Sequence, residues 1–208
     1  LLESNPEWME AVTLPTGEIV ALPAIDELQF NNMMWINKAW LERAGLAAPT
    51  TVEELTEVLR AFRDQDANGN GDPSDEIPLA GDYADGWYTN VEMPIMNAFT
   101  YYNLDLDKTA TTGSTAFGMY VEDGKIVTPF AKDEFKEGVE FVAKLVEEGL
   151  IYEGSFTQDL ASLTNICESG RLGASSGGYI LFASLGGEAY RQYTHVLPVA
   201  GPDGYQNI

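Results

Sequence analysis

A run of oxygen-bearing side chains has the clearest chemical spacing in this sequence. Residues 66–76 read Asp-Ala-Asn-Gly-Asn-Gly-Asp-Pro-Ser-Asp-Glu, with such a side chain at every second position of the first seven. Gly71 is the sixth residue, where the sharp turn of a calcium loop requires a positive φ angle. Hard oxygen ligands on a tight loop suit Ca²⁺. The predicted ligands are the side chains of Asp66, Asn68 and Asn70, the backbone carbonyl of Asp72, and a closing carboxylate from Asp75 or Glu76.

The same loop departs from an EF-hand at its end. Its twelfth position is Ile77, where an EF-hand has a bidentate glutamate, and Pro78 follows where an EF-hand continues into a helix. A calcium-driven switch is therefore not expected. We expect a structural calcium ion that staples the fold, and the alternative is a solvated Asx-rich turn without metal.

Histidine and cysteine are each present only once. Cys167 can form no intramolecular disulfide, and a single cysteine excludes Cys-based metal sites and redox pairs. His195 cannot form a His-rich zinc site and would have to serve alone in any catalytic triad. The sequence around it, Thr-His-Val-Leu-Pro-Val, is typical of a strand. We expect a structural role for His195 and a buried, inert thiol for Cys167.

The composition indicates an acidic globular protein. The 208 residues are 45% hydrophobic and 11% aromatic, which allows a substantial core. Thirty-three acidic against 11 basic residues give a formal net charge of -22, which repels phosphate backbones and anionic membranes. Nucleic acid is therefore not an expected partner. No apolar run reaches the roughly 20 residues that cross a bilayer, and residues 1–6 do not resemble a signal peptide, so any targeting sequence or anchor would lie outside this segment.

Cap signals predict helices on both sides of the loop. Asn37 precedes an amphipathic run at 38–44 that Gly45 would end. Thr51 and Glu54 form a capping box for a helix that ends near residue 63 and leads into the acidic loop. Further helices are expected at residues 93–102, from 133 up to Gly149, at 157–168 and at 179–185.

Extended runs lie between these helices. Residues 17–25, 172–176 and 195–199 predict strands. Residues 117–128 predict a hairpin, because Asp123-Gly124 between alternating strands favours a type I′ turn. Strands that alternate with helices of this length indicate an α/β fold, with a mixed sheet flanked by helices.

Several segments together resemble the family 1 extracellular solute-binding proteins. Residues 17–23 read GEIVALP, 35–46 read WINKAWLERAGL and 49–55 read PTTVEEL. The family pattern is a strand ending in Leu-Pro or Tyr-Pro, an Asn-Lys helix start and a Pro-x-Thr-x-x-Glu helix start. The acidic loop is similar to the structural calcium site of alginate-binding and lipoprotein members. Residues 168–174 resemble the helix-Gly-strand step that precedes a ligand-facing aromatic residue in the family.

This resemblance implies a domain organisation and a setting. Residues 1–208 would form the second, C-terminal lobe of a two-lobed type II periplasmic-binding-protein fold, with hinge strands near 18–25 and 195–202 that let the lobes close on ligand. We expect a monomer that is not an enzyme and that works with the membrane permease of an ABC importer. Its expected place is extracellular, lipid-anchored to the cell surface or periplasmic.

The resemblance also implies which residues contact the solute. Sugars need aromatic platforms for their apolar faces and carboxylates or amides for their hydroxyls. Trp87 and Tyr88 lie where maltose-type members carry a cleft aromatic, and Tyr179 lies where they carry a stacking tryptophan. Asp26 and Glu27 follow the first hinge strand, in the region of a carboxylate that accepts sugar hydroxyls. The structural alternative stays open, in which the aromatic pair anchors the core and the two glycines before Tyr179 simply turn the chain.

A carbohydrate or oligosaccharide is the expected solute, but other functions remain alternatives. One is a peptide-binding member of the same family. Another is a calcium-containing, glycoside-active enzyme domain with paired carboxylates, although Asp26 and Glu27 would point to opposite faces of a strand. A calcium-dependent adhesion or cellulosome-type module would usually duplicate the loop, which occurs once here. Because half of the cleft is absent, we expect this segment to fold and hold calcium but to bind its solute weakly or not at all.

Overall fold

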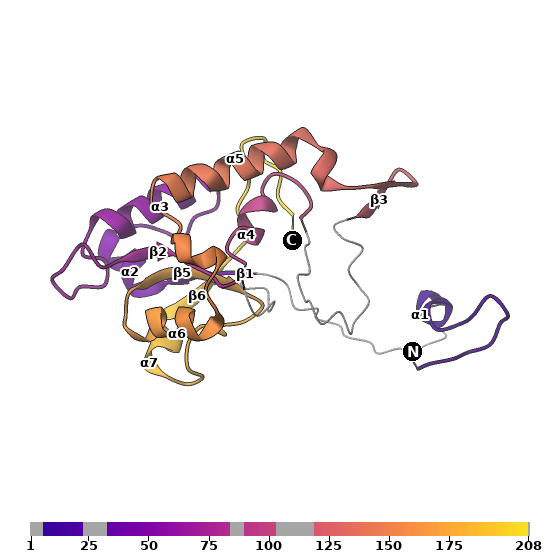
Figure 1. The fold of residues 1–208 in the computed structure, drawn as a ribbon, viewed down its shortest axis with the longest axis horizontal. Helices are drawn as coiled ribbons and strands as arrows, with labels where there is room; N and C mark the ends of the chain where they lie inside the picture. The colour runs from indigo at the N-terminus through magenta and orange to yellow at the C-terminus, as the bar shows by residue number, and fades with distance from the viewer. Residues whose placement is uncertain (1–5, 23–32, 84–89, 103–118, 208) are drawn as a thin grey trace. The chain divides into compact units, whose positions relative to one another are not determined.

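A computed structural model describes residues 6–22, 33–83, 90–102 and 119–207, and Figure 1 shows the chain as a ribbon. The chain divides into two compact units, Leu1–Phe30 and Asn31–Ile208, which are described separately. The acidic loop and the four-stranded sheet belong to the second unit.

The first unit contains helix α1 (Pro6–Ala11) and a tight turn. An isolated antiparallel bridge joins Thr13 to Ile19, and Gly17 turns the chain with a φ angle of +83°. The strand predicted at 17–25 is wrong for residues 17–22, which form this bridge but no strand, and residues 23–25 lie outside the described part. Val20 and Leu22 favour a strand by their residue type, but both side chains are exposed. Among the described residues, no strand pairs with this segment.

The second unit is built on a mixed four-stranded sheet with the order β2-β5-β1-β6. The strands are β1 (Met33–Asn37), β2 (Ile77–Leu79), β5 (Leu172–Gly177) and β6 (Tyr193–Val196). Strand β1 pairs antiparallel with β5 and β6, so Trp35 lies opposite Ser175 on one side and His195 on the other. Strand β2 runs parallel to β5, with Ile77 opposite Leu172.

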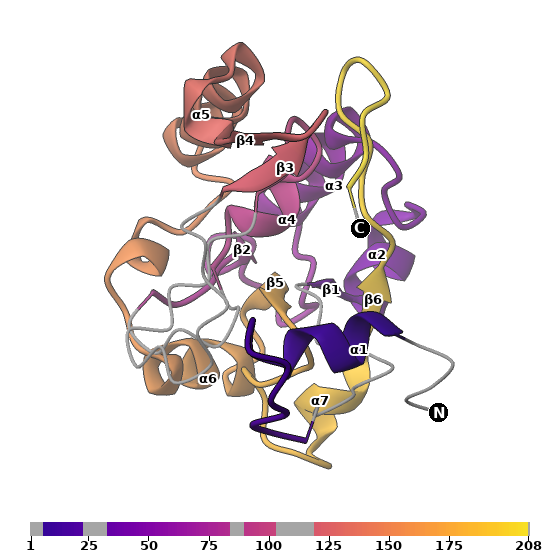
Figure 2. The ribbon, with the colours of Figure 1, turned by 90° about the vertical axis from the view of Figure 1, so that its right-hand side faces the viewer.

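Helices flank this sheet, as predicted for an α/β fold. They are α2 (Lys38–Ala44), α3 (Val52–Asp64), α4 (Met93–Met96), α5 (Asp133–Glu147), α6 (Leu160–Glu168) and α7 (Glu188–Gln192), with 3-10 turns at Pro129–Ala131 and Glu153–Phe156. Figures 1 and 2 show α3 and α5 on one side of the sheet and α6 and α7 on the other. The predicted mixed sheet flanked by helices is confirmed.

Local signals explain where α2 and α3 begin and end. The side-chain oxygen of Asn37 accepts hydrogen bonds from the amides of Ala39 and Trp40, and Gly45 ends α2 in the left-handed region. Thr51 caps α3 by accepting from the Glu54 amide at 3.2 Å. Both predicted caps are confirmed.

The sheet packs closely against α2 and α3 at Gly173 on β5. Trp40 and Phe62 meet edge to face above it, with ring centroids 5.2 Å apart. A Cβ atom at Gly173 would lie 2.6 Å from the Phe62 side chain and 2.8 Å from the Pro78 carbonyl oxygen. Only a glycine allows this approach, which joins the helices to the middle of the sheet.

Other elements differ from the sequence predictions in extent. The hairpin is confirmed as β3 (Tyr120–Glu122) and β4 (Lys125–Val127), and its turn has two positive φ angles, 51° at Asp123 and 73° at Gly124. The helix predicted at 157–168 begins at Leu160, because Asp159 caps it through the Ser162 amide. The closing strand predicted at 195–199 lies earlier, at Tyr193–Val196.

Two predicted helices are shorter or displaced. The helix predicted at 93–102 spans Met93–Met96 alone, since the Asn97 side chain then bonds the backbone amide and carbonyl of Tyr102 and turns the chain. Residues 179–185 form no helix, which corrects that prediction. Helix α7 instead follows the glycine pair at 186–187.

Candidate functional site

The predicted calcium loop links the end of α3 to the start of β2. Gly69 and Gly71 have φ angles of +78° and +92°, so the turn predicted at Gly71 is confirmed. The two carboxylate oxygens of Asp66 accept hydrogen bonds from the Gly69 amide at 2.8 Å and the Gly71 amide at 3.0 Å. The first predicted ligand therefore already holds the loop in its turned shape.

The Asp75 carboxylate is the point where several predicted ligands meet. The side-chain amides of Asn68 and Asn70 donate to its two oxygens, at 2.8 and 3.0 Å. The Asn68 and Asn70 side-chain oxygens accept from the backbone amides of Asn70 and Asp72. The side chains at 68, 70 and 75 thus contact one another in the loop, and their role as calcium ligands stays a prediction.

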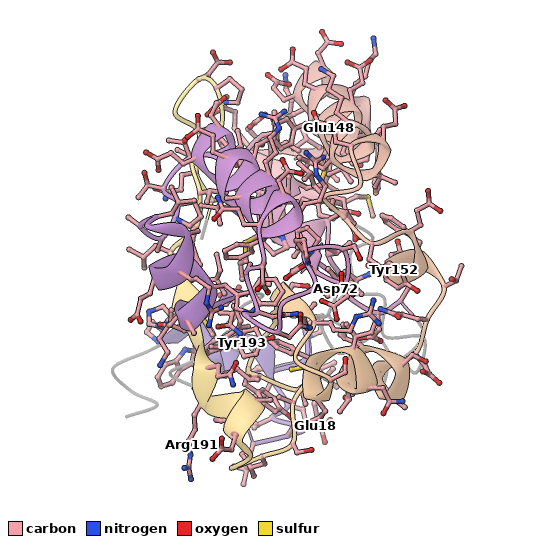
Figure 3. All side chains as sticks on the ribbon, turned by 90° about the vertical axis from the view of Figure 1, so that its left-hand side faces the viewer. Glu18, Asp72, Glu148, Tyr152, Arg191 and Tyr193 are labelled. Carbon is pink, nitrogen blue, oxygen red and sulfur yellow. The ribbon has the colours of Figure 1, made fainter. Side chains whose placement is uncertain are left out.

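Glu76 and Asp72 complete the loop in different ways. One carboxylate oxygen of Glu76 accepts a long hydrogen bond from the backbone amide of Asn68 at 3.4 Å. The other oxygen is buried without a hydrogen-bond partner among the described residues. Asp72 turns its carboxylate to the hydroxyl and amide of Ser74, and these hydrogen bonds lower the pKa of Asp72. Figure 3 labels Asp72 on this loop. A buried carboxylate oxygen without a partner is costly unless a proton or a cation compensates it.

The oxygen donors fit a hard cation better than a transition metal. All six predicted ligands carry carboxylate or amide groups, which suit Ca²⁺, and none carries sulfur or imidazole. In the described part of the chain, no three His, Cys, Asp or Glu side chains are grouped so that they could hold a metal by themselves. A calcium ion here would therefore need the amide and backbone oxygens as well as the carboxylates.

Tyr179 is the one predicted solute-binding residue that the structure places. It follows the end of β5 and is 42% exposed. The indole nitrogen of Trp35 donates to the Gly177 carbonyl at 3.0 Å, which fixes the chain just before it. The other four, Trp87, Tyr88, Asp26 and Glu27, lie outside the described residues.

A buried polar group near Val91 was missed by sequence reasoning. Asp82, Asn90 and Glu92 are each at most 8% exposed, and the Ser176 hydroxyl donates to the Asn90 carbonyl at 2.9 Å. Burial raises the pKa of Glu92, although the side chains of Tyr102 and Asn90 favour its charged form. The signal that could have found it is a carboxylate between apolar Val91 and Met93.

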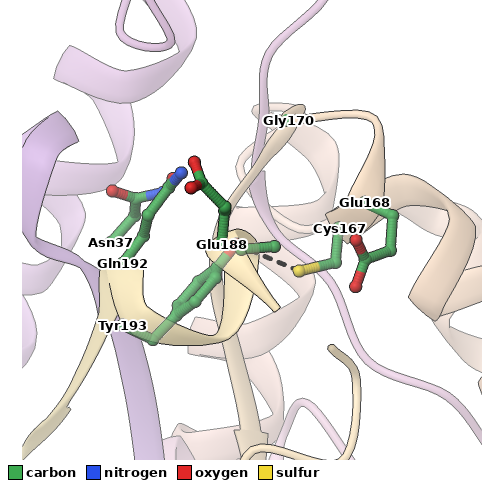
Figure 4. Close-up of a pocket in the computed structure, with 8 residues that line it drawn as sticks. Asn37, Cys167, Glu168, Gly170, Glu188, Gln192 and Tyr193 are labelled. Carbon is green, nitrogen blue, oxygen red and sulfur yellow. Dashed lines mark hydrogen bonds between the residues drawn. The ribbon is translucent and has the colours of Figure 1, made fainter. Parts of the chain in front are cut away.

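A pocket of about 300 Å³ lies beside α6, α7 and the start of α2 (Figure 4). The Cys167 thiol in its wall is 2% exposed and lies 3.6 Å from the Tyr193 hydroxyl, which itself donates to the Leu172 carbonyl at 2.6 Å. Burial raises the pKa of Cys167 to about 11, so the thiol stays protonated at neutral pH. The prediction of a buried thiol is confirmed, and the geometry gives it no nucleophilic role.

His195, on β6, is exposed, and its ring packs edge to face with that of Trp35, with the ring centroids 6.1 Å apart.

None of the helices in the described ranges is long and apolar enough to span a bilayer.

Comparison with known proteins relates this fold to transport proteins. No family model matches the chain. Among curated proteins, the fructooligosaccharide ABC transporter substrate-binding protein FusA of Streptococcus pneumoniae is 32% identical over 218 residues, which cover 100% of this chain and 37% of FusA. The predicted resemblance to extracellular solute-binding proteins is confirmed. Lipoprotein LipO of Bacillus subtilis is 29% identical over 140 residues, which cover 67% of this chain and 25% of LipO.

Solved solute-binding proteins show the same fold. The S. pneumoniae FusA structure in complex with kestose matches 100% of this chain and 40% of its own, with a TM-score of 0.76 and 30% identity. FusA was also solved as an EF-hand mutant in complex with fructo-nystose. A human-milk-oligosaccharide (HMO) binding, ABC-transporter-associated solute-binding protein from Bifidobacterium longum infantis matches with a TM-score of 0.75 and 29% identity, over 97% of this chain and 40% of its own. The chain thus spans well under half of these solute-binding proteins.

Proposed function

We propose that this chain is part of an extracellular solute-binding protein that delivers an oligosaccharide to an ABC importer. The observation that carries the proposal is the similarity of this whole chain to about two fifths of FusA, whose structure holds kestose. The Bifidobacterium relative supports the same class of solute, because it is described as binding human milk oligosaccharides. These relatives are transport components, so we infer a binding role without catalysis.

The proposal includes the place of the chain in the whole protein. Residues 1–208 form the second lobe, and residues near 18–25 and 195–202 are the hinge. The share of 40% that the chain covers in solved relatives supports one lobe of two. The full protein acts as a monomer at the outer surface and hands its solute to a membrane permease. LipO, a lipoprotein, supports a lipid anchor.

Tyr179 is the solute platform that the proposal can assign within the described residues. Tyr179 is 42% exposed and lies two residues beyond the end of the buried strand β5, and its aromatic ring suits the apolar face of a sugar. Trp87 and Tyr88 as further platforms, and Asp26 and Glu27 as hydroxyl acceptors, remain predictions of the same site.

Calorimetric titration of the full-length protein with kestose, longer fructans, human milk oligosaccharides and short peptides tests this function. We expect heat from at least one saccharide and none from the peptides. Tyr179→Ala should weaken the binding of that saccharide by about fivefold to tenfold, in line with about 1 to 1.4 kcal/mol for an aromatic contact. Tyr152→Ala is the matched control, because Tyr152 (Figure 3) is also a tyrosine, is 41% exposed, and precedes the 3-10 turn Glu153–Phe156 instead of following β5. Binding of peptides alone would refute the saccharide assignment.

We also propose that residues 66–76 hold a structural Ca²⁺. The support is the gathered donor set around Asp75, the buried oxygen of Glu76, and the EF-hand of FusA that its mutant structure names. The ion would link the end of α3 to the start of β2. With extracellular-type affinity, a calcium concentration 100 times the Kd stabilises the fold by about 2.7 kcal/mol. A thermal midpoint that does not change between EDTA and excess calcium would refute this role.

A further inference from the structure

Arg171 connects the acidic loop to the central sheet through both its backbone and its side chain. It directly precedes β5, and its carbonyl accepts the Ile77 amide at 2.8 Å, the first bond between β2 and β5. Its side-chain Nε donates to the Asp75 carbonyl at 2.8 Å. The final turn of the loop is therefore held against the strand that leads to Tyr179.

The guanidinium of Arg171 also lies against a predicted calcium ligand. Its Nε is 3.8 Å from Oδ2 of Asp75, the carboxylate that collects the amides of Asn68 and Asn70. An arginine side chain is positively charged at every physiological pH. The carboxylate at the centre of the donor set thus has a resident cation beside it.

A second arginine holds the other end of the loop. Arg43, in the last turn of α2, donates from Nη1 to the Ala67 carbonyl. Its guanidinium covers Gly69 so closely that a Cβ atom there would lie 2.9 Å from Cζ of Arg43. Of the two, Arg171 is the one whose charge is paired with a predicted ligand.

We propose that Arg171 is a positioning residue that holds the Asp75 carboxylate in place without metal and, in doing so, weakens the binding of calcium to the loop. This inference rests on the proposed calcium role of residues 66–76. Two effects act together. The guanidinium competes for the charge of Asp75, and it would repel a divalent cation bound by that carboxylate. The pair is partly exposed, so water screens both effects.

The expected size of the effect follows from Coulomb's law. A single charge about 5 Å from a divalent cation in a water-like dielectric changes the binding constant of the cation by roughly tenfold. Removing the charge of Arg171 should therefore tighten calcium binding, whereas removal of an ordinary structural contact would loosen it. The sign of the change separates the two roles.

The experiment is calcium titration of the full-length protein by calorimetry, together with thermal unfolding in EDTA and in excess calcium. Arg171→Gln keeps a donor for the Asp75 carbonyl but removes the charge, and Arg171→Lys keeps the charge. Arg60→Gln is the control, because it removes the same charge from a similarly exposed arginine. Arg60 pairs with Glu148 and not with a residue of the loop. We expect Arg171→Gln to bind calcium about tenfold more tightly, with a lower midpoint in EDTA and a wider gap between the two midpoints.

The conservative variant and the control complete the test. Arg171→Lys should restore an affinity near that of the wild type, and Arg60→Gln should leave the calcium affinity unchanged. Calcium binding by the wild type with equal or weaker binding by Arg171→Gln would overturn this inference alone. Absence of calcium binding in the wild type and in all variants would instead refute the proposed calcium role. Circular dichroism in excess calcium shows whether each variant is folded.

Discussion

At the scale of single residues, the Glu92 carboxylate is placed where its charge is expensive. The side chain is 8% exposed, and the side chains of Tyr102 and Asn90, which favour its charged form, do not offset the cost of its burial. Burial accordingly raises the pKa of Glu92 above the ordinary value of 4.5. The native protein therefore keeps this proton to a higher pH than the unfolded chain does.

This difference predicts a pH-dependent stability. Between pH 4.5 and the raised pKa of Glu92, the native state binds more protons than the unfolded state, so the free energy of unfolding falls as pH rises. Glu92→Gln removes this loss. We expect the variant and the wild type to be equally stable below pH 4.5. At pH 7, the free energy of unfolding of the variant should be higher by about 1 kcal/mol. Urea unfolding from pH 4 to pH 8 measures it.

The control for Glu92 is Glu140→Gln, which removes an exposed carboxylate from an i,i+4 pair with Lys136 on α5. Its stability should follow the wild type at every pH within a few tenths of a kcal/mol. If Glu92→Gln were less stable than the wild type at pH 7, the contacts of Tyr102 and Asn90 with the carboxylate would outweigh the cost of its burial, and the argument from burial would fail.

At the scale of elements, Thr51 shows how much one cap contributes. Its hydroxyl accepts the Glu54 amide, while the Glu54 carboxylate accepts from the amide and hydroxyl of Thr50. Thr51→Ala removes an acceptor for an orphan amide of α3 and should cost about 1 kcal/mol of unfolding free energy. Thr51→Ser keeps the hydroxyl and should stay within a few tenths of the wild type. Equal urea midpoints for the alanine and serine variants would contradict this account.

The elements also show what local sequence can and cannot predict. The starts of α2 and α3 and the β3–β4 turn were predicted, because caps and turn residues act within a few positions. Strand β1 was missed, since its five residues lead straight into α2 and are strand only through pairing with β5 and β6. Strand β2 has three residues, one of them Pro78, and is likewise defined by its partner β5.

The same division separates the two parts of the candidate site. The turn of the loop at residues 66–76 was predicted because all of the proposed donors lie within eleven consecutive residues, and the positive φ angle of Gly71 is part of that local pattern. Arg171 was not predicted as part of it, because 95 residues separate it from Glu76 and only the pairing of β2 with β5 brings it there. Long-range pairing of this kind has no signal in a local pattern.

At the scale of the whole molecule, the cleft that we propose lies between two lobes, and residues 1–208 would supply one of them. This chain matches 40% of the FusA structure. The proposed donors of the loop and Tyr179 all lie within one unit of this chain, residues 31–208. A ligand held between two lobes loses about half of its contacts when one lobe is removed. Its affinity should fall steeply, since every 1.4 kcal/mol of lost binding free energy is tenfold in Kd.

We therefore predict that residues 1–208 alone bind the solute of the full-length protein at least 100-fold more weakly, but bind calcium with similar affinity. The reason for the second part is that every donor of the loop, and Arg171 beside it, belongs to residues 31–208. Parallel calorimetric titrations of both forms with calcium and with the identified saccharide measure the two affinities. Calcium binding by the segment serves as the control for its folding. Saccharide binding of equal strength in both forms would show that one lobe holds the solute by itself, and the proposed two-lobed cleft would be wrong.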